Sequence, residues 1–467
     1  MKNYFTGIAP VLLLVPGMFF LSCGNGRKDS RNTFQLQQSG TIHEKVSCAE
    51  DPSISYSLYL PSVVKTGTAL RLPVIVFFDP HASGLLPVGK YRELAEAGQY
   101  IIIGSGNSRN GQSAAETERI AGALLSELWK NYPVDTMRIY LAGFSGGSRV
   151  ASLVALTNGR IRGVIGCGAG FPGLNQSPPR KFDYFGCAGM ADFNLGEMIR
   201  LGEMLDQAGF THFIMTFNGP HEWPPADVME SAFEWMTFKA MKEKLIKKDE
   251  SSISSFEKET EQRIDSLTGK GRMLEGFTLV EFEIGALDGL TDLTPAESKR
   301  DYLKKNTEYQ QQYTRREMAL REEQKEQQKM MTDLYTMDKK WWSRRIKSYT
   351  GSKKTTEETE ELLKNKRLLS FLSLLCYSNA NAAIKQGNSD LAYKVIDIYE
   401  LADPVNPEPN YMRSFLLMER SDTAASMAQL QMAIDKGFSD RLRLIEQPEF
   451  RGLNEYRPYF DLLQKIK

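Results

Sequence analysis

A serine between a strand-like segment and a helix-like segment is the residue of this chain best placed to do chemistry. Ser145 is the centre of Gly143-Phe-Ser145-Gly-Gly147, after the apolar run 137–142 and before the helix-like run 148–156. Glycines at these spacings permit a tight turn that exposes the hydroxyl. The N–H groups at the start of the next helix would face negative charge that develops there. The pattern predicts an acyl-transfer nucleophile, although a serine that only caps the helix has the same motif.

A serine nucleophile needs a base, and the chain has only four histidines. His43 lies before the first predicted strand, His212 opens a later strand, and His81 lies on a loop after an early strand. His221 follows the last predicted strand on a glycine-proline loop, which could carry an imidazole over the edge of a sheet. We therefore predict that His221 is the base, the alternative being an ordinary exposed loop histidine.

The base needs an acid that orients it, and Asp192 has the expected position. It follows an apolar strand-like run and the bend at Gly189, between the serine and the histidine in sequence. Asp183 competes for this role, but it precedes the strand and would lie at the opposite edge of the sheet. Asp192 could also serve only as the cap of the helix predicted from Leu195. We predict that Asp192 is the acid.

The order Ser145, Asp192, His221 resembles that of the α/β-hydrolase superfamily, over about residues 41–242. Gly-x-Ser-x-Gly, Gly-x-x-Asp and the final Pro-His-x-Trp-Pro look similar to the compact secreted esterases, including feruloyl and acetyl esterases and polyester depolymerases. The resemblance implies a serine hydrolase with an acyl-enzyme intermediate, no cofactor and no metal.

The same resemblance implies an oxyanion hole made by two backbone N–H groups. One would belong to Gly146, directly after the nucleophile. The other should come from Asp79-Pro80-His81-Ala82, where the superfamily often has His-Gly and this chain does not. Because proline has no N–H, the second donor is assigned to His81 or Ala82.

Strand-like and helix-like segments alternate from residue 41 to residue 242. The continuous apolar run Leu72–Phe78 is typical of a strand that is buried on both faces. Alternation of this kind predicts an α/β fold, with a mostly parallel sheet covered by helices on both faces and followed by an all-α C-terminal region. The short connection between residues 168 and 182 leaves little room for a cap domain, which favours a shallow site and ester groups carried on a polymer or surface.

The N-terminus has the features of a secretory signal, with Lys2 before the apolar stretch 8–20. Leu21-Ser22-Cys23-Gly24 resembles the lipobox of bacterial lipoproteins, although Phe20 stands where leucine is usual. The resemblance implies a signal peptide over 1–22, lipidation of Cys23, a flexible tether over 23–40, and anchoring to a bacterial membrane, most often the outer one. An ordinary secreted protein or an uncleaved anchor is the alternative.

Residues 243–365 are rich in charge and predict a helical linker, and residues 366–467 predict amphipathic helices. Asp390-Leu-Ala392 returns as Asp422-Thr-Ala424, 32 residues further along. This spacing is similar to the period of about 34 residues in tetratricopeptide repeats. The resemblance implies a surface that could bind a protein partner, and an unrelated helical bundle is the alternative.

Composition limits the remaining function classes. Lys plus Arg and Asp plus Glu are 58 each in 467 residues, so no net charge favours nucleic acid. Besides Cys23, the cysteines Cys48, Cys167, Cys187 and Cys376 lack metal-site spacing, and a Cys167–Cys187 disulfide or two free thiols both fit the sequence. The sequence therefore predicts an envelope carboxylesterase. A serine peptidase with the same triad and a non-catalytic scaffold lipoprotein remain alternatives.

Overall fold

The computed structural model describes residues 37–65, 69–171, 178–351, 359–453 and 455–466. The predicted signal peptide, Cys23 and most of the predicted tether lie outside these ranges. No helix within the described ranges is long and apolar enough to span a bilayer.

An eight-stranded sheet forms the centre of the N-terminal half, with the strand order β1-β2-β4-β3-β5-β6-β7-β8. The pairings of β1 with β2 and of β2 with β4 are antiparallel, and all the others are parallel. The prediction that His43 precedes the first strand is wrong, because His43 belongs to the edge strand β1. The strands are β1 (Ile42–Ser47), β2 (Ser55–Tyr59), β3 (Leu72–Phe78), β4 (Ile101–Ser105), β5 (Val134–Phe144), β6 (Gly163–Cys167), β7 (Asp183–Gly189) and β8 (His212–Phe217).

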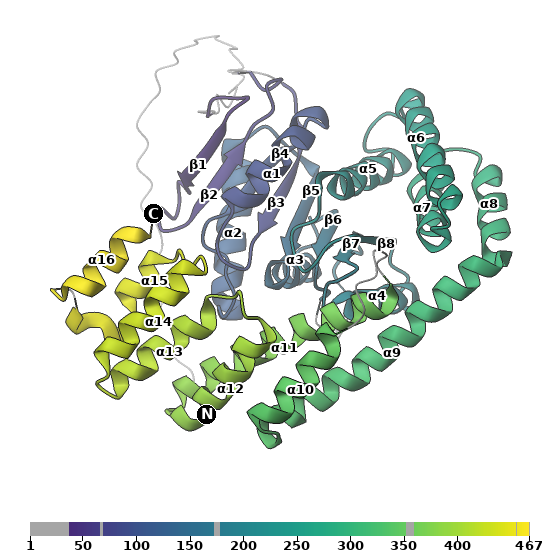
Figure 1. Ribbon diagram of the computed structural model, residues 1–467. Helices are drawn as coiled ribbons and strands as arrows, with labels where there is room; N and C mark the ends of the chain where they lie inside the picture. Colours follow the sequence, from purple (N-terminus) through teal and green to yellow (C-terminus); the bar gives the residue numbers. More distant parts are fainter. Residues whose placement is uncertain (1–36, 66–68, 172–177, 352–358, 454, 467) are drawn as a thin grey trace, which may run out of the picture.

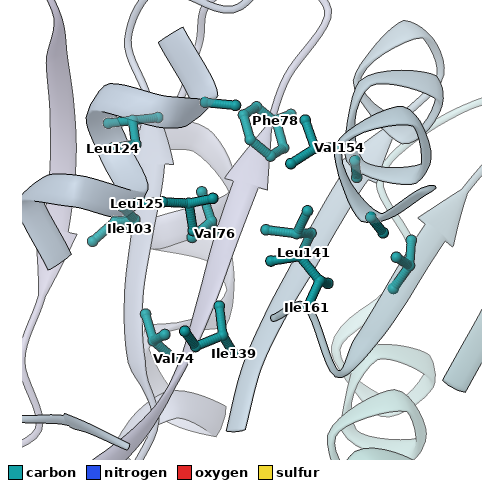
Figure 2. Close-up of a cluster of buried hydrophobic side chains, with 14 of the residues drawn as sticks. Val74, Val76, Phe78, Ile103, Leu124, Leu125, Ile139, Leu141, Val154 and Ile161 are labelled. Atoms are coloured by element: carbon teal, nitrogen blue, oxygen red, sulfur yellow. The ribbon is translucent and has the colours of Figure 1, made fainter. Parts of the chain in front are cut away.

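Helices cover both faces of this sheet, as predicted, and the central strands send side chains to each face in turn. Along β3, Val74, Val76 and Phe78 enter one apolar cluster, whereas Ile75 and Phe77 enter the other. Figure 2 shows the first cluster, where α2 and α3 pack against the sheet. The helices are α2 (Ala114–Asn131), α3 (Gly146–Thr157) and α4 (Leu195–Gln207) on this face, and α1 (Leu85–Ala97) and α5 (Ala226–Lys242) on the other.

The first part of the predicted charged linker packs against the sheet domain. Phe256 on α6 (Glu250–Gly269) and Phe282 on α7 (Met273–Leu287) are buried in the same cluster as Phe185 of β7. The ring centroids of Phe185 and Phe282 lie 6.0 Å apart. Helices α6 and α7 therefore extend the core on the α5 face, which the charge content of this segment did not indicate.

One carboxylate on α5, facing α6 of the added layer, should make stability depend on pH. Burial raises the pKa of Glu234 on α5 from 4.5 to about 7. The negative charges of Glu230 and Glu259 raise it further, and the positive charge of Arg263 lowers it. A raised pKa means that stability present below about pH 4.5 is lost as the pH rises through about 7. We expect Glu234→Gln to raise the free energy of unfolding at pH 8 by about 1 kcal/mol and to leave it unchanged at pH 5. Urea unfolding at both pH values, with the exposed Glu118→Gln as control, measures this; an equal gain at both would contradict it.

The remaining helices form an arc that runs along one side of the sheet domain and below it (Figure 1). The long helix α9 contacts both α7 and α11, so it connects the added layer to the C-terminal helices. The helices are α8 (Thr294–Lys305), α9 (Thr307–Thr336), α10 (Lys339–Thr350), α11 (Glu360–Lys385), α12 (Ser389–Ala402), α13 (Glu408–Glu419), α14 (Thr423–Asp435), α15 (Arg441–Glu446) and α16 (Arg457–Lys465), with a 3₁₀ helix over Pro448–Leu453.

The all-α C-terminal region is confirmed, and its helices pack in pairs, α11 with α12 and α13 with α14. The second helices of the two pairs correspond at a spacing of 34 residues rather than the 32 expected from the sequence. Gly387 and Ser421 both have positive φ, at 68° and 60°. The next residues, Asn388 and Asp422, both cap their helices through the side chain. The spacing of a helix-pair repeat is therefore present, while its assignment as tetratricopeptide-like stays a prediction.

Candidate active site

Ser145 lies on the sharp turn between β5 and α3, with φ 52° and ψ −119°, a conformation that is rare for residues other than glycine. The turn needs both glycines of the motif. A Cβ on Gly143 would lie 2.1 Å from the carbonyl oxygen of Gly147, and a Cβ on Gly147 would lie 1.9 Å from that of Phe78. The Ser145 N–H donates to the carbonyl of Cys167 at 2.8 Å, which ties the strained residue to β6.

The three residues chosen from the sequence come together at the carboxyl ends of β5, β7 and β8. Nε2 of His221 lies 3.0 Å from Oγ of Ser145, and its Nδ1 lies 2.9 Å from Oδ1 of Asp192. Asp183 instead opens β7, at the other end of that strand. The geometry is that of a serine, a base within hydrogen-bond reach, and an acid that orients the base.

The imidazole of His221 is held in place by aromatic rings. Its ring centroid lies 4.6 Å from that of Phe144 and 4.3 Å from that of Phe193. Helix α1 fixes the loop just after the histidine, because Nζ of Lys90 donates to the carbonyl of Trp223 at 2.8 Å. These contacts give the base a defined position.

Asp192 is 1% exposed and uses one carboxylate oxygen for two hydrogen bonds. Oδ1 accepts from Nδ1 of His221 and, at 2.8 Å, from the backbone N–H of Asn194. Oδ2 is buried and has no hydrogen-bond partner among the described residues. The buried carboxylate therefore fixes the ring of His221 through Nδ1 and lies where it can meet the charge that the imidazole gains during proton transfer.

A glycine beside the triad should be needed for full activity, because it leaves room for the catalytic side chains. Gly168 has φ +65°, and a Cβ there would lie 3.1 Å from Oδ2 of Asp192 and 3.1 Å from Cε1 of His221. We expect Gly168→Ala to lower kcat roughly tenfold or more, because a small displacement of the base is costly in rate. Steady-state kinetics checks this against Gly387→Ala, a glycine with φ +68° and open space around its Cβ position. Equal losses in both variants would contradict this role of Gly168.

The loop predicted to supply the second oxyanion donor is organised around Asp79, which sequence reasoning missed. The N–H of His81 donates to Oδ1 of Asp79 at 2.9 Å, and the N–H of Ala82 lies 3.3 Å from the carbonyl oxygen of Asp79. Oδ2 of Asp79 accepts from Nε1 of Trp223 at 2.9 Å. Because both N–H groups are engaged in this structure, His81 or Ala82 as the second donor stays a prediction. The N–H of Gly146 opens α3 and has no intrahelical acceptor.

The side-chain amide of Asn110 lies beside Gly146, the expected first donor of the oxyanion hole. A Cβ on Gly146 would lie 1.8 Å from Oδ1 of Asn110, so the Asn110 carboxamide lies directly against the residue after the nucleophile. The loop that carries it is fixed, since the N–H of Asn110 donates to the carbonyl of Pro80 at 2.9 Å. Nothing in the sequence around Asn110 indicates this position, because the contact joins two loops that are distant along the chain.

The cysteines near the site are free thiols. Cys167 and Cys187 are paired residues on β6 and β7, and both are buried and unbridged. Burial raises the pKa of the Cys167 thiol well above its usual range. Within the described ranges, His, Cys, Asp and Glu side chains form no group of three that could hold a metal ion.

No protein-family model matches this chain, and the search of curated proteins gives no match. Among solved structures, the chain is similar to an S-formylglutathione hydrolase from Staphylococcus aureus, with 13% identity, 43% of this chain and 98% of that chain covered, and a TM-score of 0.35. An esterase from the archaeon Pyrobaculum calidifontis has 14% identity, with 45% of this chain and 86% of that chain covered and a TM-score of 0.34. A ferulic acid esterase has 16% identity, with 41% of this chain and 94% of that chain covered and a TM-score of 0.33. Likenesses at these TM-scores carry no argument about activity.

Proposed function

We propose that this protein is a serine hydrolase of the cell envelope that cleaves carboxylic esters. The observation that carries the proposal is the continuous hydrogen-bonded series from Ser145 through His221 to the buried Asp192, with distances of 3.0 and 2.9 Å. The strained backbone of Ser145 supports it, because strain of this kind gathers at functional sites.

The arrangement accounts for a two-step reaction. Nε2 of His221 takes the proton of the Ser145 hydroxyl as its oxygen attacks the ester carbonyl. The same nitrogen then gives the proton to the leaving alcohol, and an acyl group stays on the serine. Water, deprotonated by His221, releases the acid and restores the hydroxyl. Asp192 keeps Nδ1 protonated and stabilises the imidazolium that forms in both steps.

Negative charge on the acyl oxygen would be met by the N–H of Gly146, which has no acceptor among the residues that the structure describes. A second donor would come from His81 or Ala82, as the sequence suggests, or from Nδ2 of Asn110. A side-chain amide can take this role, and its loss lowers kcat by about 10²–10³ in such sites. Asn110→Ala therefore distinguishes the side-chain donor from a backbone donor, which the substitution leaves in place.

Substrate choice separates the proposal from its rivals. We expect the protein to hydrolyse short p-nitrophenyl, acetyl or feruloyl esters, and to leave chromogenic peptides of similar size uncut. Preference for the peptides would favour a serine peptidase. No turnover of either class, together with no fluorophosphonate adduct on Ser145 in folded protein, would favour a scaffold lipoprotein that holds a partner through its C-terminal helices.

Attachment to a membrane through Cys23 is part of the same proposal. It rests on the lipobox-like Leu21-Ser22-Cys23-Gly24. The anchor would hold the enzyme at the surface of a bacterial membrane, the outer membrane in this proposal, where it would act on exposed esters. We expect cells that express the full chain to incorporate labelled palmitate into it, and Cys23→Ser to abolish the label. Persistent labelling of the variant would contradict this anchor.

A further inference from the structure

One arginine of the C-terminal helices reaches the loop that carries the catalytic acid. Arg367 on α11 has a fully buried side chain, and its Nη1 donates to the carbonyl oxygen of Met190 at 2.7 Å. Met190 stands two positions before Asp192 in the turn that follows β7. In Figure 1, α11 passes the end of β7, consistent with this contact.

Met190 is where the loop of the acid and the loop of the base meet. Its N–H donates to the carbonyl of Phe217 at 2.8 Å, and the N–H of Ala191 donates to the carbonyl of Gly219 at 2.9 Å. Both acceptors belong to the segment that leads from β8 to His221. The N–H groups of Met190 and Ala191 are therefore fixed by the base loop, and the carbonyl of Met190 is fixed by Arg367.

Arg367 is itself held in one orientation by two carboxylates. Nε donates to Oε2 of Glu323 on α9 at 2.7 Å, and Nη2 donates to Oε1 of Glu360 at 3.1 Å. The side chain of Glu323 is only 4% exposed. A planar guanidinium bound on three sides cannot be replaced by the single point charge of a lysine. The position of the Met190 carbonyl thus depends on how α9 and α11 pack together.

We propose that Arg367 is a positioning residue of the active site, through which the C-terminal helices hold Asp192 in line with His221. The inference rests on the proposed function, since it assigns to the helices a role in the same triad. A shift of α11 relative to the sheet would move the Met190 carbonyl, then the carboxylate of Asp192, and then the imidazole. A change in the packing of these helices, far from Ser145, would therefore change kcat.

Loss of this contact should alter turnover rather than substrate binding. We expect Arg367→Met to lower kcat about tenfold while KM stays within about twofold, because the chemical step needs an aligned base and acid. The acid side of the kcat/KM profile should also move to lower pH, because a displaced Asp192 stabilises the imidazolium less. A purely structural role of Arg367 would move neither the split between kcat and KM nor the pH profile.

Removal of the buried arginine alone leaves the Glu323 carboxyl, whose pKa burial already raises to about 7, without its ion-pair partner, which could destabilise the helices. The paired variant Glu323→Leu/Arg367→Met removes the buried ion pair and leaves only Glu360, whose side chain is 23% exposed, which keeps the test possible. Arg413→Met is the matched control, because Arg413 is a largely buried arginine on α13 that binds Asp397 and Glu400 of α12. Circular dichroism and thermal melting establish that each variant is folded.

The decisive experiment is a double-mutant cycle with Asp192→Ala, read by ester hydrolysis and by the rate of fluorophosphonate labelling. If Arg367 acts through Asp192, the paired variant slows the wild-type background about tenfold and the Asp192→Ala background less than twofold. Equal tenfold losses in both backgrounds, or a loss matched by Arg413→Met, would overturn the inference. An inactive wild type would instead contradict the proposed function, and the Ser145→Ala variant measured alongside separates the two failures.

Discussion

Ser145→Ala should lower kcat/KM for a short ester by a factor on the order of 10⁴–10⁶, to the level supplied by binding and the oxyanion hole alone. The substitution removes the nucleophilic oxygen and leaves the backbone turn intact. Stability should not fall, because alanine at this φ is no worse placed than serine. Hydrolysis of p-nitrophenyl acetate and a thermal melt measure the two effects.

The helix that follows Ser145 offers a control for this variant. Ser152 on α3 is fully buried, and its hydroxyl has no hydrogen-bond partner among the described residues. Ser152→Ala therefore removes a hydroxyl from the same helix without touching the triad, and its turnover should stay within about twofold of the wild type. Comparable activity in Ser145→Ala and the wild type would end the esterase proposal.

Substitution of Asp192 should separate orientation of the base from stabilisation of its charge. Asp192→Ala removes both and should lower kcat by on the order of 10⁴. Asp192→Asn can keep its carboxamide oxygen at the place of Oδ1, where it accepts from His221 and Asn194, and put its NH₂ at the place of the unpartnered Oδ2. Only the charge is then lost, so we expect a fall smaller than that of Asp192→Ala, about 10²–10³.

The comparison of these two variants is informative because asparagine can keep the hydrogen bond to His221 without the charge, whereas alanine loses both. Steady-state kinetics at pH 8 gives kcat for each. Equal losses in the two variants would mean that the charge of Asp192 contributes everything and its orientation of His221 nothing. Full activity in Asp192→Ala would remove Asp192 from the mechanism.

The sheet could be predicted from the sequence because its determinants are local. Continuous apolar runs such as Leu72–Phe78 mark strands buried on both faces, and the segments between them have helical spacing. The triad could be located because parallel strands bring their carboxyl ends to one edge. A residue that follows any of those strands, such as Asp192 or His221, is then near the nucleophile without further information.

The supporting contacts could not be predicted, since each joins residues whose proximity depends on packing. Asp79 binds Nε1 of Trp223, which is 144 positions away, and Arg367 binds the carbonyl of Met190, which is 177 positions away. The one visible signal was an arginine directly before Leu368-Leu369 at the start of a predicted amphipathic helix. It indicates that a partner exists and does not identify the partner.

Charge content was a poor guide to the layer formed by α6 and α7. Their exposed faces carry many charged residues, so the mean composition resembles that of a linker. Their buried faces nevertheless place Phe256 and Phe282 in the core of the sheet domain. Periodicity over each helix, rather than average polarity over the region, would have shown the amphipathic pattern.

A single quenched reaction examines whether Ser145 forms the acyl-enzyme with His221 as its base. Rapid mixing with p-nitrophenyl acetate should release a burst of about one p-nitrophenolate per enzyme, and mass spectrometry should find the acetyl group on Ser145. The burst should be slowed by orders of magnitude in His221→Ala. A wild-type protein that turns over the ester with the acetyl group on another residue, or a His221→Ala burst as fast as the wild type, would contradict the mechanism.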